Sequence, residues 1–342
     1  MSRPNASPAV TLLDVANHLG ISRATVSLVL RNSPRVADAT RERVLKAFET
    51  LGYFYNRQAA SMRGSRTHTV GVVVNDITNP YFATLIKSIE ANLGRHGYIT
   101  FLSNSDESVE RQNWFLETVR QHNIDGIIVC PAEATSASDM RRLLSWGIPC
   151  VFASRYVPSV DVDYAGIDNR GGMALATRHL IGLGHKRIAM IGGHTRSSTG
   201  RDRLEGYLEA LEQARIKRDD HLIVPSRLTR DEGKRIIADL LRQKSPPTAA
   251  VCGNDVIAFG VMLGLRAMGL EPGKDFAVMG FDDVSEASLW EPPLSTIQVQ
   301  QDRIGEAAAE LLIQRMSDRE RPVSRIVAEP SLVVRKTCGA FR

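Results

Sequence analysis

The turn Gly20-Ile21-Ser22 separates two short helical stretches, and this arrangement constrains the start of the chain more than any other feature. Thr11 and Asp14 have the spacing of a capping box, in which the threonine hydroxyl caps the helix and the acidic side chain lies in its first turn. Gly20 suits the left-handed conformation that ends a helix, and Ser22 suits the cap of the next one. The sequence therefore predicts two helices joined by a turn of only three residues.

Apolar side chains recur at helical spacing in the second stretch and again in a third. The second stretch contains Val26, Val29 and Leu30, and the third contains Val44, Ala47, Phe48 and Leu51 before Gly52. Two short helices joined by a glycine-containing turn, together with a third helix, form a helix-turn-helix unit. A unit of this kind reads double-stranded DNA by placing its second helix in the major groove.

The basic charge of the chain is concentrated in this region. The 342-residue chain has 43 Lys and Arg against 38 Asp and Glu, a net charge of +5. Residues 1–66 hold ten basic and four acidic side chains, which gives +6, whereas the remainder of the chain has −1. Positive charge on a patterned helical segment favours contact with the DNA backbone.

Residues 11–64 resemble the DNA-binding head and hinge of the LacI/GalR repressors. The resemblance rests on the run TLLDVANHLGISRATVSLVLRNSPRVADATRERVLKAFETLGY and its continuation NRQAASMRG, and it extends through the rest of the chain. It implies that Arg23 and Ala24 open the recognition helix and face base edges, with Leu28 one turn further on. The family commonly has Arg at the position of Leu28, so an apolar contact replaces a charged one. The resemblance also implies phosphate contacts by Thr11, Ser22, Thr25, Ser27, Asn32 and Arg35.

The same resemblance assigns residues 56–63 to a hinge helix that forms when two copies meet in the minor groove. The residues placed on DNA there are Asn56, Arg57, Ala59 and Met62. Met62 stands where the family usually has a Leu that is inserted at a central base step, and a flexible apolar methionine suits the same role. We therefore expect residues 1–55 to form a helix-turn-helix DNA-binding domain and residues 56–68 a hinge helix and linker.

From residue 69 onward, short apolar segments alternate with amphipathic helical segments. The expected strands cover residues 70–74, 98–102, 126–129, 149–153, 187–191, 248–252 and 276–280, and the expected helices cover 82–96, 172–183, 201–213, 231–243 and 257–268. This alternation favours parallel sheets covered on both faces, and the number of units favours two α/β subdomains. We expect an N-subdomain of about 69–166 plus 296–328 and a C-subdomain of about 167–295 plus 329–342.

The resemblance implies that residues 69–342 form an effector-binding and dimerisation core, similar to periplasmic sugar-binding proteins. In open α/β sheets, loops at the carboxyl ends of strands form the ligand site. Here such loops combine aromatic rings, hydroxyls, amides and both signs of charge, which suits a small, polar, uncharged ligand such as a sugar. The matching positions are Tyr81, Phe82, Arg203, Asn254 and Asp282, and then Asn79, Ser154, Ser197, Thr199, Leu228 and Trp290. Ser154 stands where sugar-responsive members often have Asp, which indicates a different pattern of ligand hydroxyls.

Several of these residues have structural alternatives to ligand binding. The alternatives are a helix cap for Asp282, a surface ion pair for Arg203, and core packing for Tyr81, Phe82 and Trp290. Because the candidates come from different strand ends, we expect them to converge on one ligand rather than all to be structural.

The motifs of several enzyme classes are absent from the sequence. There is no GxGxxG after a strand, no GxxxxGK[ST], no HExxH and no GxSxG, and the eight histidines are not paired at metal-ligand spacing. Cys130, Cys150, Cys252 and Cys338 lie far apart, which is typical of reduced thiols in a cytoplasmic protein. We expect no enzyme activity, cofactor, metal or membrane segment, since no apolar run approaches the roughly 20 residues that cross a bilayer.

Together these features predict a bacterial cytoplasmic repressor that binds an inverted-repeat operator in double-stranded DNA as a homodimer. A small polar effector, a mono- or disaccharide acting as inducer, is expected to move the subdomains and so change the pairing of the hinge helices. Seven residues follow Arg335, fewer than a heptad tail for tetramers needs. The alternative interpretation is a soluble sugar-binding or sugar-processing α/β protein with an incidental basic N-terminal arm.

Overall fold

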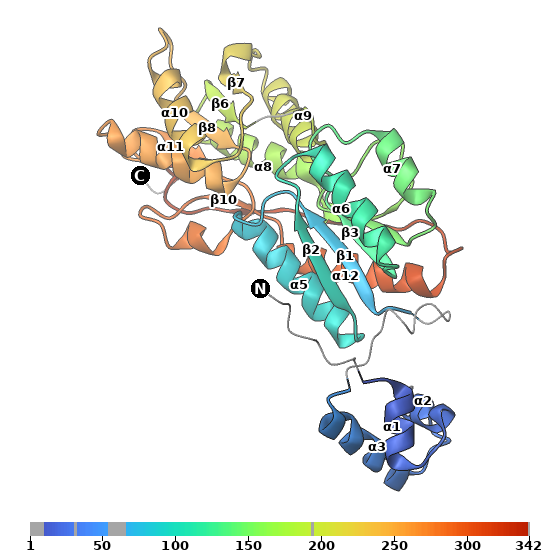
Figure 1. Cartoon of the computed structure of the whole chain (residues 1–342). Helices are drawn as coiled ribbons and strands as arrows, with labels where there is room; N and C mark the ends of the chain where they lie inside the picture. Colours follow the sequence, from blue (N-terminus) through green and yellow to red (C-terminus); the bar gives the residue numbers. More distant parts are fainter. Residues whose placement is uncertain (1–9, 31–32, 54–65, 193–194, 341–342) are drawn as a thin grey trace, which may run out of the picture. The chain divides into compact units, whose positions relative to one another are not determined.

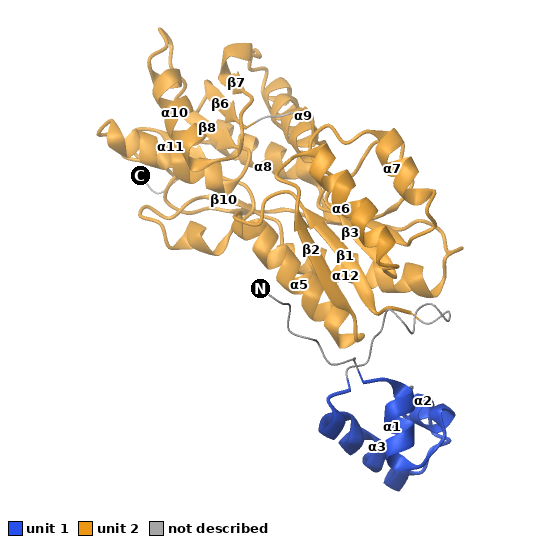
Figure 2. Cartoon of the chain, viewed as in Figure 1, with its two compact units in different colours: residues 1–65 blue, residues 66–342 orange. Residues whose placement is uncertain are grey.

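The computed structural model describes residues 10–30, 33–53, 66–192 and 195–340. The chain divides into two compact units, residues 1–65 and residues 66–342, which are coloured separately in Figure 2. The hinge helix predicted at residues 56–63 lies outside the described residues, as do the predicted DNA contacts Asn32, Asn56, Arg57, Ala59 and Met62.

Three helices make up the described part of the first unit: α1 (Leu12–Leu19), α2 (Arg23–Leu30) and α3 (Asp38–Leu51). The predicted capping box is present, with the Thr11 hydroxyl accepting from the Asp14 amide and the Asp14 carboxylate accepting from the Thr11 amide. Gly20 ends α1 at φ 64°, a left-handed geometry that glycine adopts without strain. The three predicted helices are confirmed, and their buried core consists of Val15, Ala16, Val26, Val29, Val36, Val44 and Ala47.

The second unit begins with a six-stranded parallel sheet in the order β11-β5-β4-β3-β1-β2. Its strands are β1 (Thr69–Val74), β2 (Ile99–Asn104), β3 (Gly126–Val129), β4 (Cys150–Ala153), β5 (Asp163–Ile167) and β11 (Arg325–Ala328). Helices α5 (Pro80–Arg95) and α12 (Gln301–Ser317) cover one face, and α6 (Val109–Gln121) and α7 (Ala137–Leu144) cover the other (Figure 1). We call this sheet with its helices the first lobe.

The apolar sequence of β1 follows from this layering. Val70, Val72 and Val74 belong to the cluster that contains residues of α5 and α12, whereas Val73 belongs to the cluster that contains residues of α6 and α7. A strand buried on both faces has no position for a solvated side chain, so its sequence is continuously apolar rather than alternating.

A four-stranded parallel sheet in the order β7-β6-β8-β9 forms the second lobe. Its strands are β6 (Ile188–Ile191), β7 (Ile223–Val224), β8 (Ala249–Cys252) and β9 (Ala277–Met279). The helices packed on it form two pairs, α8 (Asn169–Gly182) with α9 (Ser198–Gln213), and α10 (Arg230–Leu241) with α11 (Asp255–Ala267). Short 3-10 turns, η1 (Asp220–Leu222) and η2 (Ser285–Ser288), complete this lobe.

The chain passes between the lobes at three places, from β5 to α8, from β10 (Thr296–Gln298) to α12, and from β11 to β12 (Ser331–Val333). Strands β10 and β12 pair with each other antiparallel. Bridges join Met279, the last residue of β9, to Ser295 and join Asp282 to Gln298 of β10. Residues 296–298 therefore lie with the second lobe, and the chain returns to the first lobe just after them.

The predicted α/β alternation is confirmed. All seven expected strands and all five expected core helices are present, with ends that differ from the prediction by no more than three residues. The elements that were not predicted are strands β5, β7, β10, β11 and β12 and helices α6, α7 and α12.

Candidate DNA-binding and ligand-binding sites

The first turn of α2 presents its side chains to solvent. Arg23 and Ala24 are exposed, while Val26 and Val29 are buried and hold the opposite side of the helix against α1 and α3. The Ser22 hydroxyl accepts from the Thr25 amide at 3.1 Å, which confirms the predicted cap. An arginine at the exposed start of a recognition helix has the geometry for bidentate hydrogen bonds to a guanine.

The other predicted DNA contacts differ in exposure. Thr11, Ser22 and Arg35 are exposed, whereas Thr25 and Ser27 are half-buried. Leu28 is also half-buried and packs against the helical core, so only part of its side chain faces outward. Some of the basic charge stabilises the unit itself, because Arg41 donates to the Ser33 carbonyl at 2.6 Å and Arg43 donates to the Leu19 carbonyl at 3.3 Å.

In the second unit, the polar candidates gather around Arg203 on α9. Arg203 is only 9% exposed, its Nε donates to Asn169 Oδ1 at 2.8 Å, and its guanidinium lies 3.8 Å above the Phe281 ring. It also donates to the Gly253 carbonyl. The surface ion pair considered as an alternative is wrong for Arg203, because it is Arg201 that pairs with Asp202 and Glu205.

Asp282 lies beside this guanidinium, with Oδ1 3.7 Å from Arg203 Nη2. The carboxylate does not cap the following turn η2, whose cap position is occupied by Val284. Burial raises the pKa of Asp282 well above its usual value, and the nearby arginine opposes that shift. The pair therefore places a donor and an acceptor next to each other in a nearly water-free position.

On the first lobe, Tyr81 and Phe82 lie in the first turn of α5, each 6% exposed. Their rings meet edge to face at 5.1 Å, so both belong to the core, as the structural alternative held. The Tyr81 hydroxyl nevertheless donates to Ser154 Oγ at 2.9 Å, which connects the ends of β1 and β4 through two of the candidate residues.

Three candidates are helix caps. Asn79 accepts from the Tyr81 amide at the start of α5, Ser197 accepts from the Gly200 amide at the start of α9, and Asn254 accepts from the Ile257 amide at the start of α11. Thr199 lies in the first turn of α9, with its hydroxyl 3.3 Å from Ser197 Oγ. Each cap fixes its side chain at the carboxyl end of a strand, where ligands bind in such sheets.

The two remaining candidates have different surroundings. Leu228 lies against Gly192 and Gly253, at the carboxyl ends of β6 and β8. Trp290 is stacked on Phe259 of α11, with ring centroids 4.6 Å apart and planes at 5°, which is core packing.

A cavity of about 390 Å³ opens between the lobes next to these residues. Its walls are Asp76, Thr78 and Asn79 from the first lobe and Leu228, Thr229, Arg230, Asp231 and Val256 from the second. A volume of this size is within the range of small-molecule sites.

The sequence did not predict the ion pair between Arg155, which is buried, and Glu107, whose side chain is 28% exposed. Nη1 and Nη2 of Arg155 donate to Oε2 and Oε1 of Glu107, each at 2.8 Å. Asn75 and the Glu133 amide also donate to Glu107, and Cys130 donates to Asn75. Glu107 has φ 59°, which is uncommon for a non-glycine residue. The signal in the sequence was an arginine directly after a buried strand.

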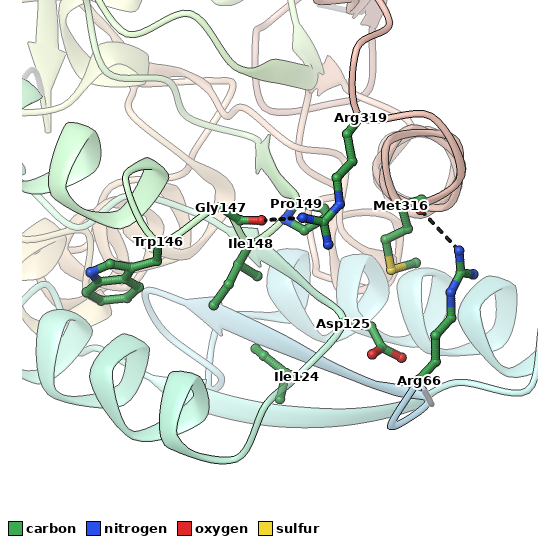
Figure 3. Close-up of a pocket in the computed structure, with 9 residues that line it drawn as sticks. All are labelled: Arg66, Ile124, Asp125, Trp146, Gly147, Ile148, Pro149, Met316 and Arg319. Carbon is green, nitrogen blue, oxygen red and sulfur yellow. Dashed lines mark hydrogen bonds between the residues drawn. The ribbon is translucent and has the colours of Figure 1, made fainter. Parts of the chain in front are cut away.

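Figure 3 shows a hollow of similar volume, about 390 Å³, at the amino end of the first lobe's sheet. Its charged groups have partners within the protein: Arg66 and Arg319 donate to backbone carbonyls at 3.1 and 3.0 Å, and Asp125 accepts from two backbone amides. The candidate residues around Arg203 lie at the opposite, carboxyl ends of the strands, where ligands bind in sheets of this kind.

Two findings concern the described residues as a whole. No group of three or more His, Cys, Asp or Glu side chains among them has the arrangement of a metal site. None of the helices described is both long and apolar enough to span a membrane.

Two family models match the chain in succession. Residues 11–56 match the model of bacterial regulatory proteins of the lacI family, and residues 67–333 match the periplasmic binding proteins and sugar binding domain of the LacI family. The chain belongs to the LacI family. Its two units are thus the family's DNA-binding and ligand-binding regions.

Relatives of this LacI-family chain match it over nearly its whole length. The HTH-type transcriptional repressor PurR of Haemophilus influenzae strain PittEE is 33% identical over 96% of this chain and 98% of its own length. The transcriptional regulator CelR in complex with cellobiose is 31% identical, with a TM-score of 0.73 over 96% of this chain and 99% of that one. The lac repressor dimer bound to operator and the anti-inducer ONPF is 26% identical, with a TM-score of 0.87 over 97% and 100%. The protein is a DNA-binding transcriptional repressor with a ligand-binding core.

Proposed function

We propose that this protein is a cytoplasmic, homodimeric repressor that releases its operator when a sugar binds between the two lobes. The observation that carries the proposal is one chain that combines an exposed Arg23 on a recognition helix with a buried polar cluster around Arg203. Support also comes from the CelR–cellobiose complex and from the operator-bound lac repressor dimer, both of which this chain resembles.

The charge of the site favours an uncharged ligand. Arg203 and Asp282 neutralise each other, so an anionic ligand would meet the carboxylate and a cationic ligand would meet the guanidinium. A sugar hydroxyl both donates and accepts, and it can therefore bind the two groups at once. Tyr81 and Ser154 on the opposite wall add two more hydroxyl groups.

Control of DNA binding would follow from the two-lobed architecture. A ligand that touches Ser154 on one lobe and Arg203 on the other changes the free energy of lobe closure. A sugar acts as an inducer only when it binds the DNA-incompetent arrangement more tightly than the DNA-competent one. The expected coupling is about 1–3 kcal/mol per site, or roughly 5- to 150-fold in operator affinity.

On DNA, we assign base recognition to Arg23 and Ala24, with a smaller contribution from Leu28. Thr11, Ser22, Thr25, Ser27 and Arg35, together with Asn32 and the hinge residues Asn56, Arg57, Ala59 and Met62, would contact the backbone and minor groove. Two such heads bind an inverted-repeat operator, because a twofold dimer requires a twofold site.

The edge strand β2 supplies a surface for the dimer. Ile99, Phe101 and Leu102 on this strand are 56%, 44% and 46% exposed, and Trp114 on the adjacent α6 is 69% exposed. An unpaired edge strand with exposed apolar side chains is a site of association. A second copy of the chain that covers β2 would bury this surface.

Fluorescence anisotropy tests the proposal with the full chain and labelled fragments of the DNA upstream of its own gene. We expect tight binding to one inverted-repeat fragment that weakens with salt, and release by one of cellobiose, glucose or ribose at constant ionic strength. The matched control is the same fragment with one half-site scrambled. DNA binding that does not depend on sequence or salt would contradict the proposal that the protein is a sequence-specific repressor. Release of the operator by a purine base but by no sugar would contradict the proposal that the ligand is a sugar.

A further inference from the structure

Tyr156 connects the two lobes although it is not part of the predicted ligand site. It lies in the loop after β4 of the first lobe, and its backbone amide donates to Ser198 Oγ on α9 at 3.0 Å. Its hydroxyl donates to the Asp202 carboxylate at 3.0 Å and accepts from Arg201 Nη2 at 3.0 Å. One residue of the first lobe thus binds three polar side chains, Ser198, Arg201 and Asp202, within the first five residues of α9.

The Tyr156 ring is held in place from its own side. Tyr164 of β5 meets it edge to face at 5.6 Å, and the Arg325 guanidinium of β11 lies 5.1 Å from the ring centroid. The first lobe therefore packs the ring, and the second lobe contacts Tyr156 at the hydroxyl, at the amide and through the Arg201 guanidinium, which lies 5.6 Å from the ring centroid. A substitution that removes the hydroxyl alone leaves these ring contacts in place.

The partners of Tyr156 are next to the ligand-binding candidates in the chain. Ser154 precedes Tyr156 by two residues, and Arg203 follows Asp202 directly on α9. When Tyr156 is bound to Asp202, the walls that carry Ser154 and Arg203 are therefore fixed relative to each other. A ligand that needs both walls binds a site that is already assembled, which lowers the cost of ordering.

We propose that Tyr156 is a latch that holds the lobes together and so positions the ligand-binding walls. The regulatory meaning of this latch rests on the proposed function, whereas its effect on the lobes does not. Tyr156 is a positioning residue, because it acts through Ser198 and Asp202. Loss of its hydroxyl shifts the lobes toward the open arrangement. The apparent affinity for a ligand that binds only closed lobes then falls in proportion to the fraction of molecules that are still closed.

A second contact between the lobes allows a direct test. The Ala134 amide of the first lobe donates to the Arg196 carbonyl of the second at 2.9 Å, and neither residue touches the Tyr156 hydroxyl in the described contacts. Both residues are exposed. If the lobes separate, the Ala134 amide loses this partner and exchanges its hydrogen faster.

Hydrogen–deuterium exchange of the full chain, without DNA or ligand, measures this separation. We expect Tyr156→Phe to accelerate exchange of the peptide that contains Ala134 by roughly 3- to 10-fold, the loss expected for one hydrogen bond. Asp202→Ala, which removes the partner of the hydroxyl on the second lobe, should give the same increase in the exchange rate of this peptide. Tyr98→Phe is the matched control, because its hydroxyl accepts from Arg66 within the first lobe at 3.2 Å.

A cross-link between the two lobes tests the opposite change, because it holds the lobes together without the Tyr156 hydroxyl. The Ala134 amide and the Arg196 carbonyl are 2.9 Å apart, so these two positions are chosen for a cysteine pair, and the four native cysteines are buried. Oxidised Ala134→Cys/Arg196→Cys in the Tyr156→Phe background should restore slow exchange at the peptide containing Tyr156, and its reduction should reverse this. Faster exchange confined to the peptides of Tyr156 and Ser198, or a uniform increase through both sheets, would overturn the latch. Because no operator or sugar is present, that outcome leaves the proposed function standing.

Discussion

Arg203 Nη2 and Asp282 Oδ1 lie 3.7 Å apart, and both side chains are almost entirely removed from solvent. Arg203 comes from α9 and Asp282 from the loop after β9, so two distant segments of the second lobe meet at this pair. Burial lowers the pKa of Arg203 and raises that of Asp282, and the attraction between the two opposes both shifts. The pair is the part of the proposed ligand site that offers both signs of charge.

Arg203→Ala should abolish the ligand response and leave operator binding nearly unchanged. The substitution removes a charged donor and its contact with Phe281, so the apparent affinity for the inducing sugar should fall about 10- to 100-fold. Operator titrations with and without the sugar measure both effects. Arg242→Ala, on an exposed part of the same lobe, serves as control. Loss of operator binding with intact sugar affinity would refute the assignment.

Arg23→Ala should reduce specific DNA binding by about 1–3 kcal/mol, because a bidentate contact to a base is lost. Arg35→Ala should weaken binding to all sequences similarly and reduce the salt slope by about one. Competition between operator and scrambled DNA at several salt concentrations distinguishes the two. Equal losses on both DNAs for Arg23→Ala would show that this arginine contacts only the backbone.

Glu107→Gln should destabilise the first lobe by about 3 kcal/mol, because it leaves the buried Arg155 without its bidentate partner. The double variant Glu107→Gln/Arg155→Met should recover part of that loss. Urea unfolding of both variants at neutral pH measures the coupling. Arg235→Met, which breaks an exposed helical pair with Glu232, should change stability by less than about 0.5 kcal/mol. Additive losses in the double variant would contradict a coupled pair.

Asp255 should make the protein less stable as pH rises from about 4 to about 6. Burial raises the pKa of Asp255 to about 6, although its carboxylate accepts from Thr296 and the Val284 amide. Within that window the folded state keeps a proton that the unfolded chain has lost. The contribution of Asp255 to the free energy of unfolding is therefore fully present below the pKa of this group in the unfolded chain. It is lost as pH rises past the pKa in the folded protein, and the total loss is roughly 3 kcal/mol.

Unfolding of wild type and Asp255→Asn at several pH values checks this slope. The wild-type advantage over Asp255→Asn should shrink across the window and stay constant above it. Glu212→Gln, an exposed change on α9, should leave the wild-type slope in place. A wild-type advantage that grows with pH would show that the carboxylate is stabilised in its charged form.

Phe101→Glu should dissociate the dimer, because a charge in the centre of the β2 surface opposes its burial. Sedimentation velocity should then show monomers, with operator affinity reduced by at least about tenfold. Ile326→Glu provides a matched control at the other edge of the same sheet, where β11 has an exposed apolar side chain. If Ile326→Glu sediments as a monomer and Phe101→Glu as a dimer, the interface lies on β11 rather than on β2.

The elements that could be predicted are those specified by neighbouring residues. The caps at Thr11 and Ser22 and the left-handed Gly20 depend on groups within three residues of each other, so their pattern is visible in the sequence. Strands such as β3 and β6 are continuously apolar because both faces are covered. Strand β5 was missed because it contains the buried Asp163, whose donors lie far along the chain: Arg315 at 2.8 Å and the Ser324 amide at 2.7 Å.

The candidate site residues likewise include some that the sequence indicated and some whose contacts depend on distant segments. Strand ends and family positions indicated Arg203 and Asp282, but the ion pair between them depends on the fold of two segments. Tryptophan is a residue type that often contacts ligands, but Trp290 is stacked on Phe259. Arg155 follows a buried strand, but its partner Glu107 comes from another strand end, and the partners of Tyr156 come from the other lobe, so neither set of contacts is visible in the local sequence.

The late position of α12 has a consequence for synthesis on the ribosome. This helix covers the face of the first lobe's sheet that includes Val72, Val151 and Ala165, and it carries Arg315, the partner of the buried Asp163. A nascent chain that has produced β1 to β5 therefore exposes an apolar sheet face and an unpaired carboxylate until α12, which is made after most of the second lobe, has emerged. The second lobe is also incomplete at that point, because β12, which pairs with β10, is made after α12. Each lobe is therefore completed only by segments that are made late in synthesis.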